Sequence, residues 1–325
     1  MAREGQENLP ISEIPNITEL EFVRHITVEG NHSGQLYRAK FENGGHLSLT
    51  IVGDLKESKR ALVFIPGISV PAIEKNGQVY SSHSPIIGYL PQGVTAICLN
   101  SWPHHDEGDL RSQFSSNAYP LGSYAEKAAL TKSLLQYVAQ QTNFEEVYVL
   151  LHSTGAAIGA RNANLLLSIS EKVKLLVLES VSATTADSKK SKDYDSLANM
   201  GCFTKLFPLG GEKGFRAFLK FIARLNPGKY YEFLAFLSTP FSTLQEELID
   251  ESRQSKEPIP DINPKFKERI LAVLGSEDDL VLLPDFAELC RQLSIKLRYI
   301  YGGNHLLARN SILAKKLVEL IFPHE

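Results

Sequence analysis

Two kinds of hydrophobic pattern divide this chain. Residues 35–41 and 46–54 alternate apolar and polar positions across a short Asn- and Gly-containing segment, residues 42–45. Asn and Gly tolerate the positive φ angles of tight hairpin turns, so this stretch predicts an antiparallel hairpin. Six later runs are short and nearly all apolar, which is typical of strands buried on both faces of a parallel sheet. They are residues 61–67, 94–100, 146–153, 173–180, 269–275 and 296–302.

Helical patterns alternate with these runs. Apolar residues recur at helical spacing in residues 123–141, 155–170, 283–294 and 311–322. Strand and helix in alternation predict right-handed crossover units. The expected fold class is therefore α/β, with a doubly wound and mostly parallel sheet that carries an N-terminal antiparallel hairpin.

One long interval interrupts this alternation and sets the expected domains. Residues 181–268 lie between two predicted strands, far more than an ordinary connection needs, and contain helical patterns of their own. We expect a helical cap or lid insert there. The α/β core would comprise residues 35–180 and 269–325, and residues 1–34, which are polar and irregular, would form an N-terminal arm.

Composition narrows the class of protein. The chain has 325 residues, of which 43% are hydrophobic, and a net charge of −3, so no bulk positive charge predicts nucleic-acid binding. No apolar run is long enough to span a bilayer, and the first ten residues do not resemble a secretion signal. The three cysteines lack metal-type spacing. We expect a cytoplasmic protein without disulfides, metal or organic cofactor.

The chemistry centres on Ser153, which stands where a buried strand meets a helix. The five residues 151–155 read Leu-His-Ser-Thr-Gly, and a nucleophile on such a turn usually has the pattern Gly-x-Ser-x-Gly. Gly155 fits this pattern, whereas Leu151 replaces the first Gly and should press on the following helix. The alternative interpretation of Ser153 is an ordinary helix N-cap.

Two further residues follow strands in the order that a triad would need. Asp278 comes three residues after Gly275, and His305 comes just after the last predicted strand in a Gly-rich loop. Open α/β sheets place their ligand sites at the carboxyl ends of strands, where all three residues are expected. Asp279 is the rival partner for the imidazole. Taken singly, the Asp is typical of a solvated loop and the His of a packed or surface residue.

These motifs resemble those of the α/β-hydrolase superfamily over about residues 35–323. The resemblance rests on the HSTG, GSEDDLV and GGNH sequences and on the leading hairpin. It implies a Ser–His–Asp hydrolase in which Ser153 attacks, His305 transfers the proton and Asp278 orients the imidazole. It also implies an oxyanion hole made by the backbone N–H groups of Thr154 and Ile68.

Several residues are candidates for the substrate pocket. Gly67 and Trp102 follow predicted strands, and Phe215 and Phe218 belong to the aromatic-rich insert. These phenylalanines either line an apolar lid or form the insert's own core. The pair His104 and His105 has no metal-ligand spacing around it, so we interpret it as a loop at the pocket edge or as plain surface.

A basic amphipathic pattern in residues 213–225 leaves the question of a membrane open. Such a helix can lie peripherally on an anionic membrane, although it more often packs on the core with its charges solvated. The sequence predicts neither a nucleic-acid partner nor a particular oligomeric state.

The expected function is a serine hydrolase that cleaves a carboxylic ester or thioester with an apolar acyl portion. An acyltransferase would use the same triad and differ only in what deacylates the enzyme. A non-catalytic protein that binds a ligand or partner through the same fold is the alternative from another class, and Leu151 favours it.

Overall fold

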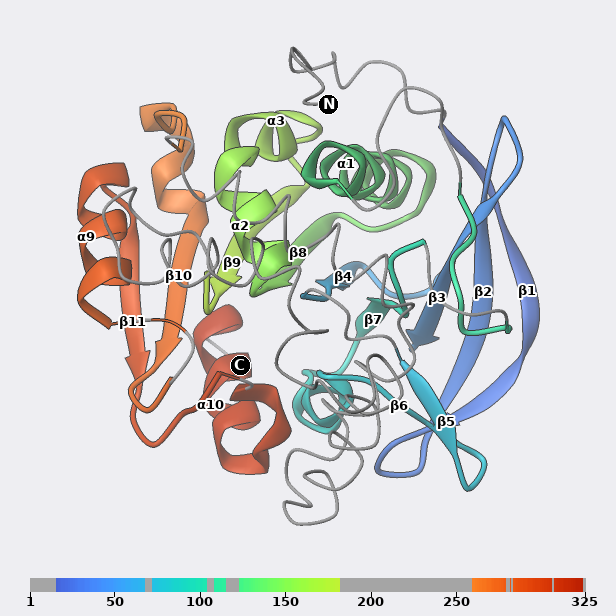
Figure 1. Cartoon of the computed structure of the whole chain (residues 1–325). Coiled ribbons are helices and arrows are strands. Elements are labelled where there is room, and N and C mark those ends of the chain that lie inside the picture. Colours follow the sequence, from blue (N-terminus) through green and yellow to red (C-terminus); the bar gives the residue numbers. More distant parts are fainter. Residues whose placement is uncertain are drawn as a thin grey trace, which may run out of the picture.

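The structure is a computed structural model that describes residues 16–67, 72–103, 108–114, 123–181, 259–278, 281, 283–305 and 307–323. Eleven strands of this part form one sheet (Figure 1). Their order is β11-β10-β9-β8-β4-β7-β3-β2-β1-β6-β5. The six strands from β11 to β7 are parallel to one another, whereas the successive pairs β7–β3, β3–β2 and β2–β1 are antiparallel. A mostly parallel sheet with a leading antiparallel hairpin is therefore confirmed.

The six apolar runs are the six parallel strands. In five of these runs most side chains are buried, as the burial of every residue of β7 and β10 illustrates. The last run, β11, is an edge strand, and most of its side chains are exposed, so burial on both faces was wrong for that run. These strands are β4 (Arg60–Ile65), β7 (Val94–Leu99), β8 (Glu146–His152), β9 (Val173–Glu179), β10 (Ile270–Gly275) and β11 (Lys296–Ile300). The expected hairpin is formed by β2 (His32–Phe41) and β3 (His46–Val52).

The N-terminal segment corrects one prediction. Residues 17–34 are not an irregular arm, because Ile17–Val28 forms β1 and pairs with β2 over its length. Most of its side chains are only partly buried, so it lacks the continuous apolar run that marked the other strands. A small hairpin of β5 (Ile73–Lys75) and β6 (Gln78–Tyr80) then extends the sheet beyond β1.

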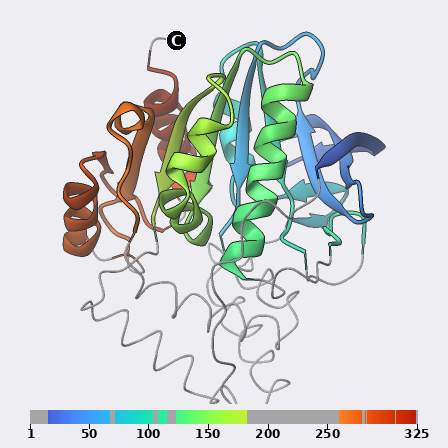
Figure 2. The ribbon, with the colours of Figure 1, turned by 90° about the horizontal axis from the view of Figure 1, so that it is seen from above.

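Helices cover both faces of the sheet (Figures 1 and 2). The larger core lies under α1, α2, α3 and α9, and the smaller core lies under α10 and the 3-10 helix η2. The predicted helix over residues 155–170 is two helices, because Asn162 leaves helical geometry between them. The bounds are α1 (Tyr124–Gln141), α2 (Thr154–Arg161), α3 (Ala163–Ser168), α9 (Leu283–Leu293), α10 (Ser311–Ile321), η2 (Ser84–Tyr89), η4 (Pro264–Arg269) and η5 (Leu307–Arg309).

Most of the expected insert, residues 182–258, lies outside the described residues. The chain is described again from Ile259, and Ile262 and Phe266 pack in the larger core beside α3 and β9. Cys98 and Cys290 are buried free thiols, and burial raises the pKa of each to about 12. No described helix combines the length and the apolar character needed to cross a bilayer.

Candidate functional site

Ser153 lies on a sharp turn between the central strand β8 and helix α2. Its φ of 51° is in the left-handed region, which a non-glycine residue adopts rarely and at a cost of about 1–3 kcal/mol. Two glycines make this turn fit: a Cβ on Gly155 would lie 2.7 Å from the carbonyl oxygen of Pro66, and one on Gly67 would lie 3.0 Å from Cβ of Ser153. The side chain of Ser153 makes no cap hydrogen bond to α2, so the N-cap interpretation does not explain the residue.

The loops after β10 and β11 bring Asp278 and His305 to this serine. Nε2 of His305 lies 3.1 Å from Oγ of Ser153. Nδ1 of the same ring lies 3.1 and 3.2 Å from the two carboxylate oxygens of Asp278. Because an ionised carboxylate only accepts hydrogen bonds, Nδ1 carries the proton, and Nε2 is left to accept the hydroxyl proton of Ser153.

The carboxylate of Asp278 is buried but well supplied with donors. Burial works to raise its pKa, whereas the hydrogen bond and charge of His305, the Val281 N–H and the Ser180 hydroxyl outweigh it, and the pKa is lowered overall. The Val281 amide donates to Oδ1 at 2.8 Å. Asp278 is therefore anionic at neutral pH and able to stabilise a cation on His305. Asp279, the rival partner, lies outside the described residues.

The two expected oxyanion donors are only partly described. Thr154 is the first residue of α2 and is fully buried, so its backbone stands at a helix N-terminus, where N–H groups lack intrahelical acceptors. Ile68 lies outside the described residues. The preceding Gly67 packs against the nucleophile turn.

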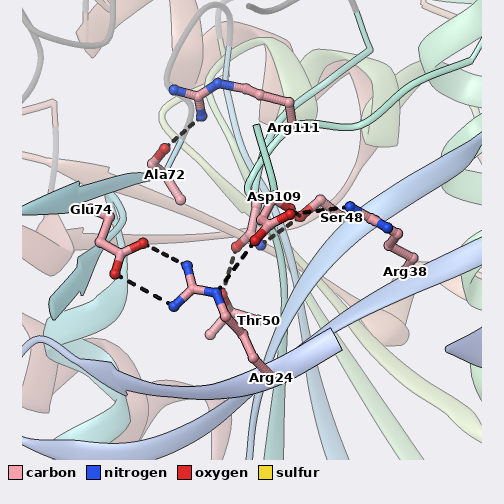
Figure 3. A network of polar contacts seen from close by, with 9 residues as sticks. Arg24, Arg38, Ser48, Thr50, Ala72, Glu74, Asp109 and Arg111 are labelled. Carbon is pink, nitrogen blue, oxygen red and sulfur yellow. Dashed lines mark hydrogen bonds and ion pairs between the residues drawn. The ribbon is translucent and has the colours of Figure 1, made fainter. Parts of the chain in front are cut away.

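Polar contacts hold both sides of the segment that contains Ile68. On one side, the Trp102 indole N–H donates to the Gly67 carbonyl at 3.2 Å. On the other, the Arg111 guanidinium donates to the Ala72 carbonyl at 2.7 Å, as Figure 3 shows, and the Ala72 amide donates to the Asn100 carbonyl at 2.6 Å. Gly67 and Ala72, the described residues on either side of positions 68–71, are thus each held by hydrogen bonds.

Figure 3 also shows the ion pairs that neighbour Arg111. Arg24 pairs with Glu74 at 2.6 Å and reaches Asp109 at 3.5 Å, and Arg38 pairs with Asp109 at 3.1 Å. All four side chains are at least one-third exposed, so these pairs contribute little stability individually. They link β1, β2 and β5 to the loop that carries Arg111.

The remaining pocket candidates separate into two groups. Trp102 is described and is only 1% exposed, so its ring lies beneath the Gly67 turn rather than on an open surface. Phe215, Phe218, His104 and His105 lie outside the described residues. Their proposed places at a pocket stay predictions.

A second polar cluster, which the sequence analysis did not identify, lies beside the Ser153 turn. Glu179, His83 and His152 are all buried, and Oε2 of Glu179 lies 3.0 Å from Nε2 of His83 and 3.6 Å from Nδ1 of His152. We call these three residues the Glu179 cluster. The signal that could have revealed it is the charged residue at the end of the otherwise apolar run 173–180.

Among the described residues, the Glu179 cluster is the group whose side chains could hold a metal ion, since its ligand atoms lie within 4.8 Å of one another. The hydrogen bonds of the cluster favour a proton on Nε2 of His83 over a bound metal ion. Glu179 can only accept, so Nε2 of His83 carries hydrogen, and Nδ1 accepts from the Ser82 hydroxyl at 2.5 Å. A metal would have to displace this donor, and bonds of about 2.0–2.1 Å would require the ligands to move together.

Burial and the neighbouring groups determine the protonation states of His83 and Glu179 in this cluster. Burial lowers the pKa of His83 to about 4, against the opposing influence of Glu179, so the ring is neutral at pH 7. Burial acts to raise the pKa of Glu179, but the neighbouring His152 and His83, of which His83 also donates a hydrogen bond, lower it overall. Glu179 is therefore a buried anion held by N–H donors.

Comparison with solved structures identifies the fold. The bottromycin epimerase BotH in complex with bottromycin A2 superposes with a TM-score of 0.60 at 11% identity, over 88% of this chain and 99% of that one. A structure from work on carboxylesterases of Nitrososphaera gargenis gives 0.54 at 16%, over 87% and 96%. MGS-M2, an α/β-hydrolase enzyme from a Medee basin deep-sea metagenome library, gives 0.55 at 17%, over 86% and 95%.

The sequence comparisons gave no relatives: no family model matches this chain, and neither does any curated protein. Identities of 11–17% to solved structures carry information about the fold and not about the reaction. The sheet order, the strand-to-helix turn at Ser153 and these superpositions together show that the chain has the α/β-hydrolase fold.

Proposed function

We propose that this protein is a serine hydrolase that cleaves a carboxylic ester or thioester with an apolar acyl portion. The observation that carries the proposal is the unbroken series of contacts from the Ser153 hydroxyl through the His305 imidazole to the Asp278 carboxylate. Each atom in the series has the protonation that proton transfer from serine requires.

In the proposed reaction, Ser153 attacks the carbonyl carbon while Nε2 of His305 takes the hydroxyl proton. The imidazolium that forms is stabilised by Asp278, and it then protonates the leaving alcohol or thiol as the tetrahedral intermediate collapses to an acyl-enzyme. Water, activated by the same imidazole, releases the acid in the second half of the reaction. The residues named here supply acid–base and nucleophilic chemistry without a cofactor.

The developing negative charge needs donors that are in place before the reaction. The Thr154 N–H at the start of α2 is one proposed donor, and its helix directs partial positive charge toward the turn. The Ile68 N–H is the second, and hydrogen bonds hold Gly67 and Ala72, the described residues on either side of its segment. Removing one such donor typically costs about 10²- to 10³-fold in turnover.

The substrate class is proposed from the sequence. The aromatic residues of the insert, Phe215 and Phe218 among them, favour an apolar acyl portion that a lid would cover. An acyltransferase with the same triad, and a binding protein without turnover, are the alternatives. The epimerase among the structural neighbours illustrates that this fold also serves other chemistry.

A fluorophosphonate probe tests the proposal. It should label the wild-type protein, and labelling should disappear in Ser153→Ala while persisting in Ser168→Ala, a control in which an exposed helical serine is changed. p-Nitrophenyl esters of graded acyl length, assayed with wild type and Ser153→Ala, then define the preferred chain. Folded wild-type protein that is neither labelled nor active would favour the binding protein.

A further inference from the structure

Glu179 connects the three loops that carry the proposed triad. It is the last residue of β9 and is 0% exposed. Its backbone carbonyl accepts the amide of Ser153 at 2.9 Å. The amide of the next residue, Ser180, donates to the Val273 carbonyl in β10, the strand that leads to the Asp278 loop, at 2.9 Å.

The side chain of Glu179 reaches the loop that carries His305. Its Oε1 accepts the backbone N–H of Leu307 at 3.2 Å, two residues after the imidazole. Leu307 is fully buried, and a Cβ on Gly303 would lie 2.3 Å from its Cδ2, so the Leu307 side chain packs closely against the loop residue two positions before His305. The carboxylate therefore joins the histidine loop to the end of β9.

The other oxygen of Glu179 is held from the opposite side. Oε2 accepts Nε2–H of His83 at 3.0 Å. The segment around His83 is in turn bound to Arg309, four residues after His305. Arg309 donates to the Ser81 carbonyl at 3.0 Å and to the Glu29 carboxylate at 2.6 Å. Contacts on both of its oxygens thus hold the Glu179 carboxylate in place, so that it can accept the Leu307 N–H without moving.

The carboxylate of Glu179 and the imidazole of His305 share one neighbour, the His152 ring. The His152 ring stands between them, with Nδ1 at 3.6 Å from Oε2 of Glu179 and its centroid 4.9 Å from that of His305. Within the described part of the chain, Nδ1 of His152 makes no hydrogen bond. The titratable and charged groups around Glu179 are thus His83, His152 and, farther out, Arg309, whereas Asp278 faces His305 from the other side.

We propose that Glu179 is a positioning residue of this site, which holds the His305 loop in register with Ser153 and sets a negative charge behind the imidazole. The inference rests on the proposed hydrolase function for its kinetic consequences. Its structural consequence, protection of the Leu307 amide, does not depend on turnover.

Two substitutions test the length and the charge of the Glu179 side chain separately. Glu179→Asp keeps the charge but is shorter by one methylene, so it cannot hold Leu307 and His83 together. We expect kcat to fall about tenfold or more with KM within twofold of wild type, because the proton acceptor is displaced and binding is not. Hydrogen exchange of the peptide containing Leu307 should become faster.

Glu179→Gln keeps the size and one oxygen for Leu307 but removes the charge. The acid limb of kcat/KM should move by about half a pH unit or more toward lower pH, because the imidazolium of His305 loses a neighbouring anion. If Glu179 served folding alone, Glu179→Gln would lower thermal stability and leave the acid limb of kcat/KM unchanged. The matched control is Glu146→Gln, the same change at the first residue of β8, which is the end of that strand away from Ser153.

The outcomes are distinct. Unchanged Leu307 exchange and kcat in folded Glu179→Asp, with an unchanged acid limb in Glu179→Gln, would overturn the inference. If one variant does not fold, the other still decides. Wild-type protein without activity or probe labelling overturns the hydrolase function, while Leu307 exchange in Glu179→Asp continues to report whether the carboxylate holds the loop.

Discussion

The side chain of Leu151 fills the space that a Cβ on Gly159 would need. The Cδ2 atom of this fully buried leucine would lie 2.9 Å from such a Cβ, with Leu178 close behind at 3.1 Å. The bulk that the sequence placed two residues before Ser153 is therefore accommodated one helical turn into α2, by a glycine. The bulk of Leu151 is thus matched by the absence of a side chain at Gly159.

Because Leu151 occupies the space beside Gly159, the effect of Gly159→Ala on the free energy of unfolding should depend on whether Leu151 is present. Gly159→Ala should destabilise the wild type by about 1–2 kcal/mol, since overpacking outweighs the better helix propensity of Ala. In a Leu151→Ala background only the contact with Leu178 at 3.1 Å remains, so the same change should range from nearly neutral to stabilising by up to about 1 kcal/mol. Urea unfolding of the four proteins measures the cycle. Equal effects of Gly159→Ala in both backgrounds would show that the two residues are not coupled.

Asp278→Asn should abolish most turnover while preserving the fold. The amide can still accept the Val281 N–H through its oxygen, but its NH₂ group would face Nδ1 of His305 and force the ring proton onto Nε2. That tautomer cannot accept the serine proton, so kcat should fall about 10³- to 10⁴-fold. Ester hydrolysis and thermal unfolding test this together. A loss below tenfold would assign the orienting role to another residue.

Arg111→Met should weaken turnover through the segment that contains Ile68. The variant loses the donor to the Ala72 carbonyl, and weaker support for Ile68, the proposed oxyanion donor, should lower kcat about tenfold. The rate of fluorophosphonate labelling should fall in parallel. Arg38→Met is the control, because Arg38 shares the ion-pair network through Asp109 without contacting Ala72. Similar losses in both variants would point to the network as a whole.

The buried His83 predicts how stability depends on pH. Its pKa is about 4 in the folded protein and about 6.5 in the unfolded chain, so between these values the unfolded chain binds more protons. The free energy of unfolding should therefore be largest above pH 6.5 and decrease toward pH 4, by up to about 3 kcal/mol from this residue. Glu179, whose pKa is also lowered, continues the decrease below its ordinary value of 4.5.

Urea unfolding at a series of pH values checks this dependence. His83→Gln should flatten the slope between pH 4 and 6.5 while leaving the loss at lower pH. A slope that is unchanged in His83→Gln would place the titrating group elsewhere, for example at the partly buried His46, whose pKa is also lowered by burial.

The parallel part of the sheet and the chain order of the site residues could be predicted from local sequence patterns. Strands such as β8 and β10 are buried on both faces and must be apolar throughout, so their pattern is visible without neighbours. Because these strands are parallel, residues just after them meet at one edge of the sheet. That rule, together with the HSTG, GSEDDLV and GGNH motifs, predicted that Ser153, Asp278 and His305 lie together, and the structure places them in contact.

Features that depend on partners distant in sequence could not be predicted in this way and are visible only in the folded chain. β1 was missed because its side chains are half exposed and its strand character comes from pairing with β2. The fit of Leu151 was settled by Gly159 on the next helix, and the Glu179 cluster by a histidine that lies nearly a hundred residues earlier. Local patterns record which side of an element is buried, whereas the identity of the neighbour that fills a space or shares a proton is fixed only when the chain has folded.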